Sequence, residues 1–282
     1  MRIEFADVKK KLGNFTLGEL QFDIPAGYII GLIGPNGSGK TTLLHLLMGL
    51  YNPSEGEIKV DGMTYEDGEK VLLDNLGVVL VEDLFEGSLT LLENGRDYGK
   101  YYSRYEEKIL IEYLGRFDLN PNQAYRKLSK GQKLKFQLAF ALAHKPKLLV
   151  LDEPTGNFDP NFREEFFRIL KEFMADGEKS VILATHITED LDRMADYIIY
   201  LEKGKQIFAG DVETLRESYR IVVGENYKIK LLAPEKIIHT EEGTYGTKAL
   251  VKHTRRSLYD KEVTVMVPTI EELMYFMAKR RK

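Results

Sequence analysis

The sequence contains no cysteine among its 282 residues. This absence excludes disulfide frameworks, cysteine-ligated zinc clusters and thiol nucleophiles, and it is compatible with a cytoplasmic protein. No apolar stretch comes near the ~20 residues that a transmembrane helix needs, and residues 1–5 lack the apolar core of a signal peptide. We therefore expect a soluble, cytoplasmic chain, for which any role at a membrane depends on a partner protein.

Excess positive charge is also missing. The chain has 40 Lys and Arg against 44 Asp and Glu, for a formal net charge of −4. Proteins that bind nucleic acid usually carry a basic excess or a basic stripe, so we expect no nucleic-acid partner. The terminal residues 279–282 form the one basic cluster, which is either a solvated tail or a contact for anionic lipid.

What is present is the composition of a globular protein with a large core. Hydrophobic residues make up 43% of the chain, an ordinary share, and the length suits one large domain with a small appendage. Short apolar runs alternate with helical patterns over residues 1–218. This alternation predicts an α/β domain with a mainly parallel core sheet and a helical subdomain at about 82–146. Residues 219–282 predict a small β-rich extension that closes with a helix.

The individual elements can be placed approximately. Apolar runs predict buried strands at residues 28–33, 76–81, 147–151, 181–185 and 197–201. Helical patterns cover residues 41–50, 161–174 and 188–195. In the extension we expect strands at 221–223, 227–232, 249–252 and 263–267, and a helix at 270–278. The tyrosines at 98–105 either line a groove for a partner or belong to the core or the ordinary surface.

Residues 34–41 match the phosphate-loop pattern G-x-x-x-x-G-K-[ST]. Backbone N–H groups of such a loop surround phosphates, and the helix that follows adds a partial positive charge. An ordinary glycine turn would match by chance in roughly 1 chain in 100, but the position between a predicted strand and a predicted helix favours nucleotide binding. We expect Lys40 to reach the β- and γ-phosphates of ATP and Thr41 to ligate Mg²⁺. The predicted binding residues are Gly34, Pro35, Asn36, Gly37, Ser38, Gly39, Lys40, Thr41 and Thr42.

Two carboxylates, Asp152 and Glu153, end the apolar strand that begins near residue 147. Side chains alternate along a strand, so we expect the two to point differently and to act differently. Asp152 would hold Mg²⁺ through water, and Glu153 would orient and deprotonate the attacking water at the γ-phosphate. An isolated acidic pair is usually a solvated strand end, but the phosphate loop favours the catalytic interpretation.

Residues 128–132 read Leu-Ser-Lys-Gly-Gln, and they narrow the function. They resemble the L-S-G-G-Q signature of ABC ATPases, with Lys130 at the usual first glycine. Ser129 and Gln132 also match a capping box for the helix that follows, and the two interpretations are compatible. The resemblance covers about residues 1–210. Together with the closing segment 268–273, it is similar to the ATP-binding subunits of bacterial ABC-2-type exporters.

The resemblance implies an α/β P-loop ATPase fold with an antiparallel β subdomain and a helical subdomain. His186 resembles the switch histidine of the family, which contacts the γ-phosphate and supports catalysis, although a histidine after a strand is often structural. Residues 156–159 resemble the loop that crosses the dimer interface, which implies that Asp159 approaches the nucleotide. Asp159 followed by Pro160 is also a natural start for the next helix.

Two positions depart from the family pattern. The glutamine expected after the strand 76–81 is missing, and Val81 or Glu82 stands there. Glu82 is the candidate that would approach Mg²⁺ or water. The aromatic residue expected to stack on adenine would lie near Leu12, which is not aromatic, and Phe15 is the candidate substitute.

The family mechanism implies two subunits paired head to tail, as a homodimer or with a related chain. Each ATP would lie between the phosphate loop of one chain and Ser129, Gly131 and Gln132 of the other. Closure on ATP and reopening after hydrolysis would drive a separate membrane permease, whose cytoplasmic helix would dock beside Glu82. The cofactors expected are ATP and Mg²⁺, and the protein would be peripheral on the inner face of the cell membrane.

Two alternative functions remain open at this point. A soluble ABC ATPase of translation or DNA maintenance usually has two ATPase domains or a long coiled coil, and this sequence shows one phosphate loop and no long heptad segment. An assembly module that binds ATP but hardly hydrolyses it would not need the intact Glu153 and His186. The extension at 219–282 either regulates or stabilises a dimer, or simply packs against the ATPase core.

Overall fold

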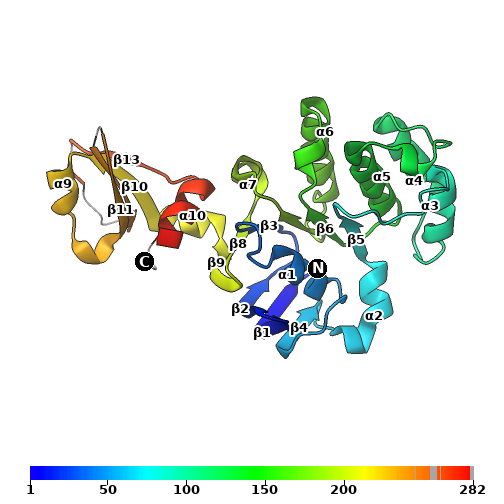
Figure 1. Cartoon of the computed structure of the whole chain (residues 1–282), viewed down its shortest axis with the longest axis horizontal. Coiled ribbons are helices and arrows are strands. Elements are labelled where there is room, and N and C mark those ends of the chain that lie inside the picture. The colour runs from blue at the N-terminus through cyan, green and yellow to red at the C-terminus, as the bar shows by residue number, and fades with distance from the viewer. Residues whose placement is uncertain (245, 255–258, 261, 280–282) are drawn as a thin grey trace.

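Three sheets organise the part of the chain that the computed structural model describes, residues 1–244, 246–254, 259–260 and 262–279 (Figure 1). Residues 280–282, which belong to the predicted basic cluster, lie outside the described residues.

The central sheet has six strands in the order β5-β6-β7-β3-β8-β9. Five of them are parallel, and β9 is antiparallel to β8. All five residues of β3 and of β7 are buried, which explains why these strands read as continuous apolar runs. Because parallel strands end at one edge, the loops after β3, β6 and β7 converge there. The bounds are β3 (Ile29–Ile33), β5 (Leu76–Val79), β6 (Leu148–Asp152), β7 (Ser180–Ala184), β8 (Tyr197–Glu202) and β9 (Lys205–Asp211).

A second, antiparallel sheet has the order β2-β1-β4. Its strands are β1 (Ile3–Leu12), β2 (Phe15–Ile24) and β4 (Glu55–Val60). Helix α1 (Lys40–Leu47) shares one hydrophobic cluster with this sheet and with β3, because its leucines at 43, 44, 46 and 47 are all buried. The expected antiparallel β subdomain is confirmed, and it supports the helix that starts at the phosphate loop.

The helical subdomain follows β5. It contains α3 (Leu91–Gly99), α4 (Glu107–Arg116), the short η1 (Tyr125–Lys127) and α5 (Lys130–Ala143), while α2 (Tyr65–Asp74) precedes β5. Some tyrosines of this region pack against other rings in the core, and another is exposed at the surface. Tyr102 stacks on the buried His144 with ring centroids 3.9 Å apart, and Tyr98 packs edge-on against Phe85, whereas Tyr101 is 73% exposed.

Helices α6 (Pro160–Phe173) and α7 (Thr188–Met194) follow β6 and β7, where the amphipathic patterns predict them. The apolar face of α6 is buried through Phe162, Phe166, Ile169 and Leu170. A short turn, η2 (Thr155–Asn157), separates β6 from α6. In the described part of the chain no helix has the length and hydropathy needed to cross a bilayer.

Helix α8 (Val212–Ser218) leads into a third sheet, β11-β12-β10-β13, which is antiparallel throughout. Figure 1 shows this sheet at the opposite end of the molecule from α3, α4 and α5. Its strands are β10 (Tyr219–Gly224), β11 (Ile237–Gly243), β12 (Gly246–Lys252) and β13 (Thr264–Met266). Helix α10 (Ile270–Lys279) follows this sheet and packs against α7. Residue 218 as a domain boundary stays a prediction.

The strand expected at residues 227–232 is wrong. Residues Asn226–Lys230 form helix α9 instead. The alternation of Tyr227, Ile229 and Leu231 suggested a strand, yet Tyr227 is 59% exposed and Leu231 is 78% exposed. Only Ile229 and Leu232, spaced three residues apart as on one helix face, pack against the third sheet.

Candidate active site

The phosphate loop connects β3 to α1, as the sequence pattern predicts. Gly34 has φ of 155°, and a Cβ there would lie 2.2 Å from the carbonyl oxygen of Leu201. Gly39 caps α1 with φ of 109°, and a Cβ there would lie 2.7 Å from the Leu17 side chain. Both positions therefore favour glycine, because both have a positive φ and because a side chain at Gly34 would also collide with backbone.

Two polar side chains of this loop, those of Ser38 and Lys40, are buried. Lys40 is only 8% exposed, and its Nζ donates to the carbonyl oxygen of Gly34 over 2.7 Å. The Ser38 hydroxyl is buried and has no protein partner among the described residues. A buried hydroxyl and a buried ammonium beside the N-terminus of a helix form an anion cradle, since each offers a donor to a bound oxygen.

A cavity of about 330 Å³ opens at this loop. Its lining brings the phosphate loop and the start of β2 together with the end of β6, which lies more than 100 residues farther along the sequence. The lining residues are Phe15, Asn36, Gly37, Ser38, Gly39, Lys40, Thr41, Thr42, Asp152 and Glu153. Gly34 and Pro35 form the base of the loop through the Lys40 contact.

Asp152 is the last residue of β6 and faces Thr41 and Lys40. Burial raises the pKa of Asp152, and the charge of Glu153 acts in the same direction, while Lys40 and a hydrogen bond with the Thr41 side chain oppose the rise. A hydroxyl and a carboxylate side by side suit Mg²⁺, which prefers one or two protein oxygens together with phosphate and water oxygens. Among the described residues no cluster of three or more His, Asp or Glu side chains could hold a metal by itself.

Glu153 leaves the strand in a way that alternation does not predict. β6 ends at Asp152, and Glu153 adopts a left-handed backbone with φ of 46° while its N–H donates to the Ala184 oxygen over 2.8 Å. Both carboxylates consequently line the same cavity, although strand alternation would send them to opposite faces. The two side chains differ in their partners, because that of Glu153 turns toward the loop after β7.

His186 is the partner of Glu153. Its Nδ1 lies 2.7 Å from Oε2 of Glu153, and its backbone N–H donates to the same oxygen over 3.4 Å. The His186 side chain is 67% exposed and that of Glu153 is 24% exposed. The contact therefore lies at the mouth of the cavity, where a carboxylate and an imidazole can both reach an attacking water.

The structure places Phe15 at the cavity and Glu82 outside it. The half-buried ring of Phe15 lies against Gly39 at the cavity, beside the phosphate loop. Glu82 is exposed, follows a strand that ends three residues earlier than it, and is not among the residues that line the cavity. The structure thus does not place Glu82 in the cavity that Thr41 and Asp152 line.

Gln137 of α5 is a residue that the motif search missed. Its side chain is buried, accepts from the Leu80 N–H over 2.7 Å and donates to the Glu82 oxygen over 2.9 Å. It therefore connects the segment after β5 to the signature helix. A single glutamine on the apolar side of a predicted helix was the available signal, since a buried amide needs partners.

The signature segment caps α5 as predicted. The Ser129 hydroxyl accepts from the Gln132 N–H over 3.2 Å, and the Gln132 side chain accepts from the Ser129 N–H over 2.9 Å. A Cβ on Gly131 would lie 2.5 Å from the Asn157 oxygen, so this helix start packs closely on the η2 turn. Ser129, Gly131 and Gln132 do not belong to the lining of the cavity in their own chain.

Asp159 begins α6, also as predicted. Its Oδ1 accepts from the Phe162 N–H over 2.9 Å, and this hydrogen bond is the main reason why the pKa of Asp159 lies below its usual value. Lys135 of α5 lies 3.4 Å from its other oxygen. Asp159 does not line the cavity within its own chain.

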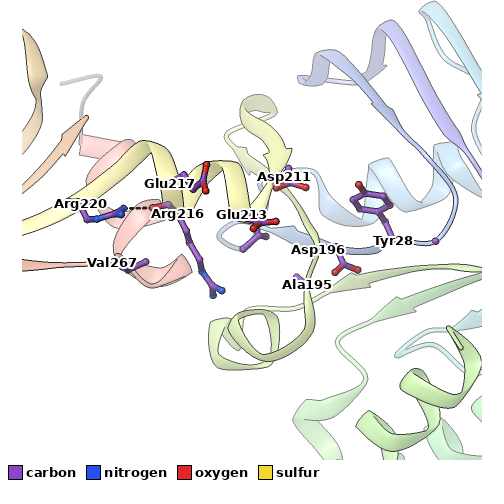
Figure 2. A pocket seen from close by; sticks show the side chains of 11 residues that line it. Tyr28, Ala195, Asp196, Asp211, Glu213, Arg216, Glu217, Arg220 and Val267 are labelled. Atoms are coloured by element: carbon purple, nitrogen blue, oxygen red, sulfur yellow. Dashed lines mark hydrogen bonds between the residues drawn. The ribbon is translucent and has the colours of Figure 1, made fainter. Parts of the chain in front are cut away.

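A larger cavity of about 710 Å³ lies between the start of β3, helix α8 and the extension. Figure 2 shows Asp196, Asp211 and Glu213 on its side nearer Tyr28, with Glu217, Arg216 and Arg220 farther along. Arg216 pairs with Asp192, and Arg220 donates to carbonyl oxygens of Arg216 and Tyr219. This mainly acidic lining would repel a polyphosphate, so the smaller cavity at the phosphate loop is the candidate nucleotide site.

Comparison with known proteins agrees with this geometry. The family described as "ABC transporter" matches residues 17–156. The Nod factor export ATP-binding protein I of Rhizobium leguminosarum bv. viciae is 35% identical over 222 residues, which are 76% of this chain and 71% of that protein. The protein of the same name from Burkholderia lata is also 35% identical, over 77% of this chain and 73% of its own length.

Solved structures give the same result for the fold. An ATP-binding subunit of an ABC transporter has a TM-score of 0.71 and 26% identity, and the match covers 77% of this chain and 92% of that one. The ATP-binding cassette MJ0796, solved as a dimer in a post-hydrolysis state with ADP and Pi, has a TM-score of 0.67 and 28% identity. That match covers 74% of this chain and 98% of the cassette.

Proposed function

This chain belongs to the ABC transporter family, and from that premise we propose that it is the ATP-hydrolysing subunit of an exporter whose membrane-spanning part is a separate permease. It is an ATPase that binds ATP at the phosphate loop. The export direction follows from the names of its relatives, which are export ATP-binding proteins. The proposed location is the inner face of the cell membrane, held there through the permease.

The residues of the cavity divide the chemistry among them. We assign the phosphates to the N–H groups of residues 34–42, with Lys40 on the β- and γ-phosphates and Ser38 as a further donor. Phe15 is positioned to contact the base. Thr41 and Asp152 would hold Mg²⁺, which when bound neutralises developing charge on the phosphates. Glu82 stays a weaker metal candidate because it is outside the cavity.

Glu153 is assigned as the base that orients and deprotonates the attacking water. Its contact with His186 orients the carboxylate at the cavity mouth. His186 would also reach the γ-phosphate, as its exposed ring allows. The observation that carries this assignment is the meeting of Lys40, Thr41, Asp152 and Glu153 in one cavity, since it combines phosphate, metal and water sites.

The other half of each site is assigned to a second copy or a related chain. Ser129, Gly131 and Gln132 lie at a capped helix start where Ser129 is exposed and the other two are half-buried, an arrangement that suits a γ-phosphate presented from outside. Asp159 would face the same interface from the next helix. ATP would thus favour the closed dimer by adding contacts that only closure permits, and hydrolysis would remove them. The dimeric cassette MJ0796 supports this arrangement.

The permease contact is assigned to the surface around α2 and the segment after β5. Val71 is 51% exposed, Val81 is 56% exposed and Tyr101 is 73% exposed, all of them apolar or aromatic. Ser103 donates to Asp74, which places the loop after α3 beside the end of α2. Exposed apolar side chains on these segments suit contact with a cytoplasmic helix of a permease. Residues 219–282 are proposed as a separate appended domain.

The central test is the substitution Glu153→Gln. We expect ATP affinity to stay within about twofold while turnover falls by at least a hundredfold, because the amide cannot accept the water proton. The same variant should accumulate as an ATP-bound dimer on size-exclusion chromatography. Glu189→Gln is the matched control, because it removes an equal charge from an exposed position three residues beyond His186. Normal turnover by Glu153→Gln would remove this residue from the catalytic role.

The exporter assignment has its own test. Purification of the tagged chain from native membranes is expected to recover a multi-spanning protein that stimulates the ATPase. Recovery with ribosomes or DNA-maintenance complexes, and no such protein, would instead support a soluble ABC ATPase.

A further inference from the structure

A buried carboxylate outside the nucleotide cavity has no role in the functions assigned so far. The side chain of Asp190, on α7, is only 2% exposed. Its Oδ2 accepts from the Thr155 hydroxyl over 2.7 Å, and its Oδ1 accepts from Nε of Arg163 over 3.1 Å. Thr155 is itself 3% exposed, so the hydrogen bond between the two side chains is shielded from water.

This hydrogen bond joins the same two segments as the catalytic contact. Glu153 and Thr155 lie two residues apart after β6, and His186 and Asp190 lie four residues apart after β7, His186 before α7 and Asp190 within it. Two cross-links therefore connect the segments: Glu153 with His186 at the cavity mouth, and Thr155 with Asp190 beneath it. Arg163 extends the inner cross-link to α6.

The two cross-links differ in exposure, and exposure decides which one holds the geometry. The His186 side chain is 67% exposed, so water competes for its contact with Glu153. The inner cross-link is buried, involves a charge and is closed by an ion pair, conditions under which hydrogen bonds are strongest. The outer contact can form and break, while the inner one keeps the segments in register.

The burial of Asp190 itself points to positioning rather than to stability. A buried ion pair recovers little net stability, because removing both charges from water offsets their attraction. An apolar residue would fill this place between α6 and α7 at no greater cost. The Arg193–Glu164 pair already joins those helices at the surface. The Asp190 carboxylate adds a directional hydrogen bond from Thr155, which lies in the turn that follows Glu153.

We propose that Thr155 and Asp190 are positioning residues for ATP hydrolysis, which hold the Glu153 turn against the His186 segment. This inference rests on the roles proposed above for Glu153 and His186. Neither residue touches nucleotide within this chain, since neither lines the phosphate-loop cavity. They act by limiting how far the two catalytic side chains can separate. A displacement of about 1 Å at such a site costs about a hundredfold in rate.

The test compares Thr155→Val with Thr155→Ser. Valine keeps the shape of threonine and removes the hydroxyl, whereas serine keeps the hydroxyl. We expect kcat to fall about tenfold to a hundredfold in Thr155→Val, with the Kd for ATP changed less than about twofold, and to recover in Thr155→Ser. Glu164→Gln is the control, because it breaks the surface pair between the same helices without touching Thr155. Its kcat should stay within about twofold.

A double-mutant cycle then asks whether Thr155 acts through the catalytic contact. In a His186→Ala background, measured by single turnover, Thr155→Val should have little further effect, because the contact it supports is already gone. Additive losses would show an independent structural role and overturn the inference. So would wild-type kcat in Thr155→Val, or an equal loss in Thr155→Ser. If Glu153→Gln and His186→Ala themselves keep wild-type turnover, the proposed function fails instead.

Discussion

At the scale of single residues, the left-handed backbone of Glu153 is the most informative feature of the site. Its φ of 46° is unusual for a residue with a side chain, and the N–H bond to Ala184 holds it. Such strain persists only where the surroundings impose it, and here it turns the carboxylate toward His186. The sequence motif at the end of β6 predicts a carboxylate at this position. The direction in which that carboxylate points depends on the hydrogen bond with Ala184 of β7.

This strain predicts a difference between two inactive variants. Glu153→Gly and Glu153→Ala both remove the carboxylate, but only glycine adopts a positive φ without steric cost. We expect the glycine variant to be more stable than the alanine variant by about 1 kcal/mol, measured by urea denaturation. The opposite order would mean that the turn relaxes when the carboxylate is removed.

At the scale of elements, α5 connects the signature segment at its start to strand β5 of the central sheet at its end. Its N-terminus is a capping box that packs on η2, and its middle holds the segment after β5 through Gln137. Its C-cap, His144, lies between the carbonyl oxygens of Leu76 and Phe140 at 3.0 and 3.1 Å. The helix therefore links β5 directly to the predicted dimer surface at the start of α5.

The burial of His144 predicts how stability depends on pH. Burial lowers the pKa of His144 to about 4, and the two carbonyl oxygens oppose this only in part. The unfolded chain takes up a proton near pH 6.5 while the folded chain does not, so the folded state loses stability as the pH falls from 6.5 toward 4. The loss should reach about 3 kcal/mol at most.

The variant His144→Phe isolates this effect. Phenylalanine keeps the ring that stacks on Tyr102 but cannot bind a proton. Urea denaturation at pH 4.5 and pH 7 should show a smaller difference in unfolding free energy for His144→Phe than for the unmodified chain. Equal differences would mean that other groups control this pH range.

At the scale of the whole molecule, the proposal is that the active site is complete only when a second chain contributes to it. The cavity joins segments of the first two sheets, while the capped start of α5 lies outside it. Helix α8 and the extension both contact α7. Oδ1 of Asp192 on α7 accepts from the N–H of Ile270 in the extension and from Arg216 of α8. Helix α7 is thus held between α6 and α10, directly after the His186 loop (Figure 1).

The two-chain arrangement predicts separate effects of Ser129→Arg. The bulky cation should block closure and reduce turnover at least tenfold, while nucleotide binding to the same chain stays within about twofold, because Ser129 is outside the cavity. Ser129→Ala is the comparison variant, since it removes the hydroxyl, and with it the helix cap at a cost of about 1 kcal/mol and the assigned γ-phosphate contact, without adding bulk or charge. Chromatography with ATP in the Glu153→Gln background reports closure. Loss of binding in Ser129→Arg would contradict a site shared by two chains.

Features that depend on neighbouring residues could be predicted from the sequence alone. The phosphate loop, the Ser129–Gln132 capping box and the Asp159 cap each lie within a few residues, so spacing alone determines their chemistry. The alternation of apolar strands with helices likewise determined the class of the fold, because buried parallel strands need continuous apolar runs.

Features that depend on distant segments were decided only by the tertiary structure. His186 meets Glu153, and Asp190 meets Thr155, across more than 30 residues of sequence. The alternation of Tyr227, Ile229 and Leu231 predicted a strand where helix α9 forms. Such a pattern does not reveal which of these apolar side chains will be buried against another element. The sequence alone thus determined which phosphate-binding groups the chain carries. Packing of the ends of β6 and β7 against each other decided that Glu153 meets His186, since contacts there depend on the sheet order and on burial.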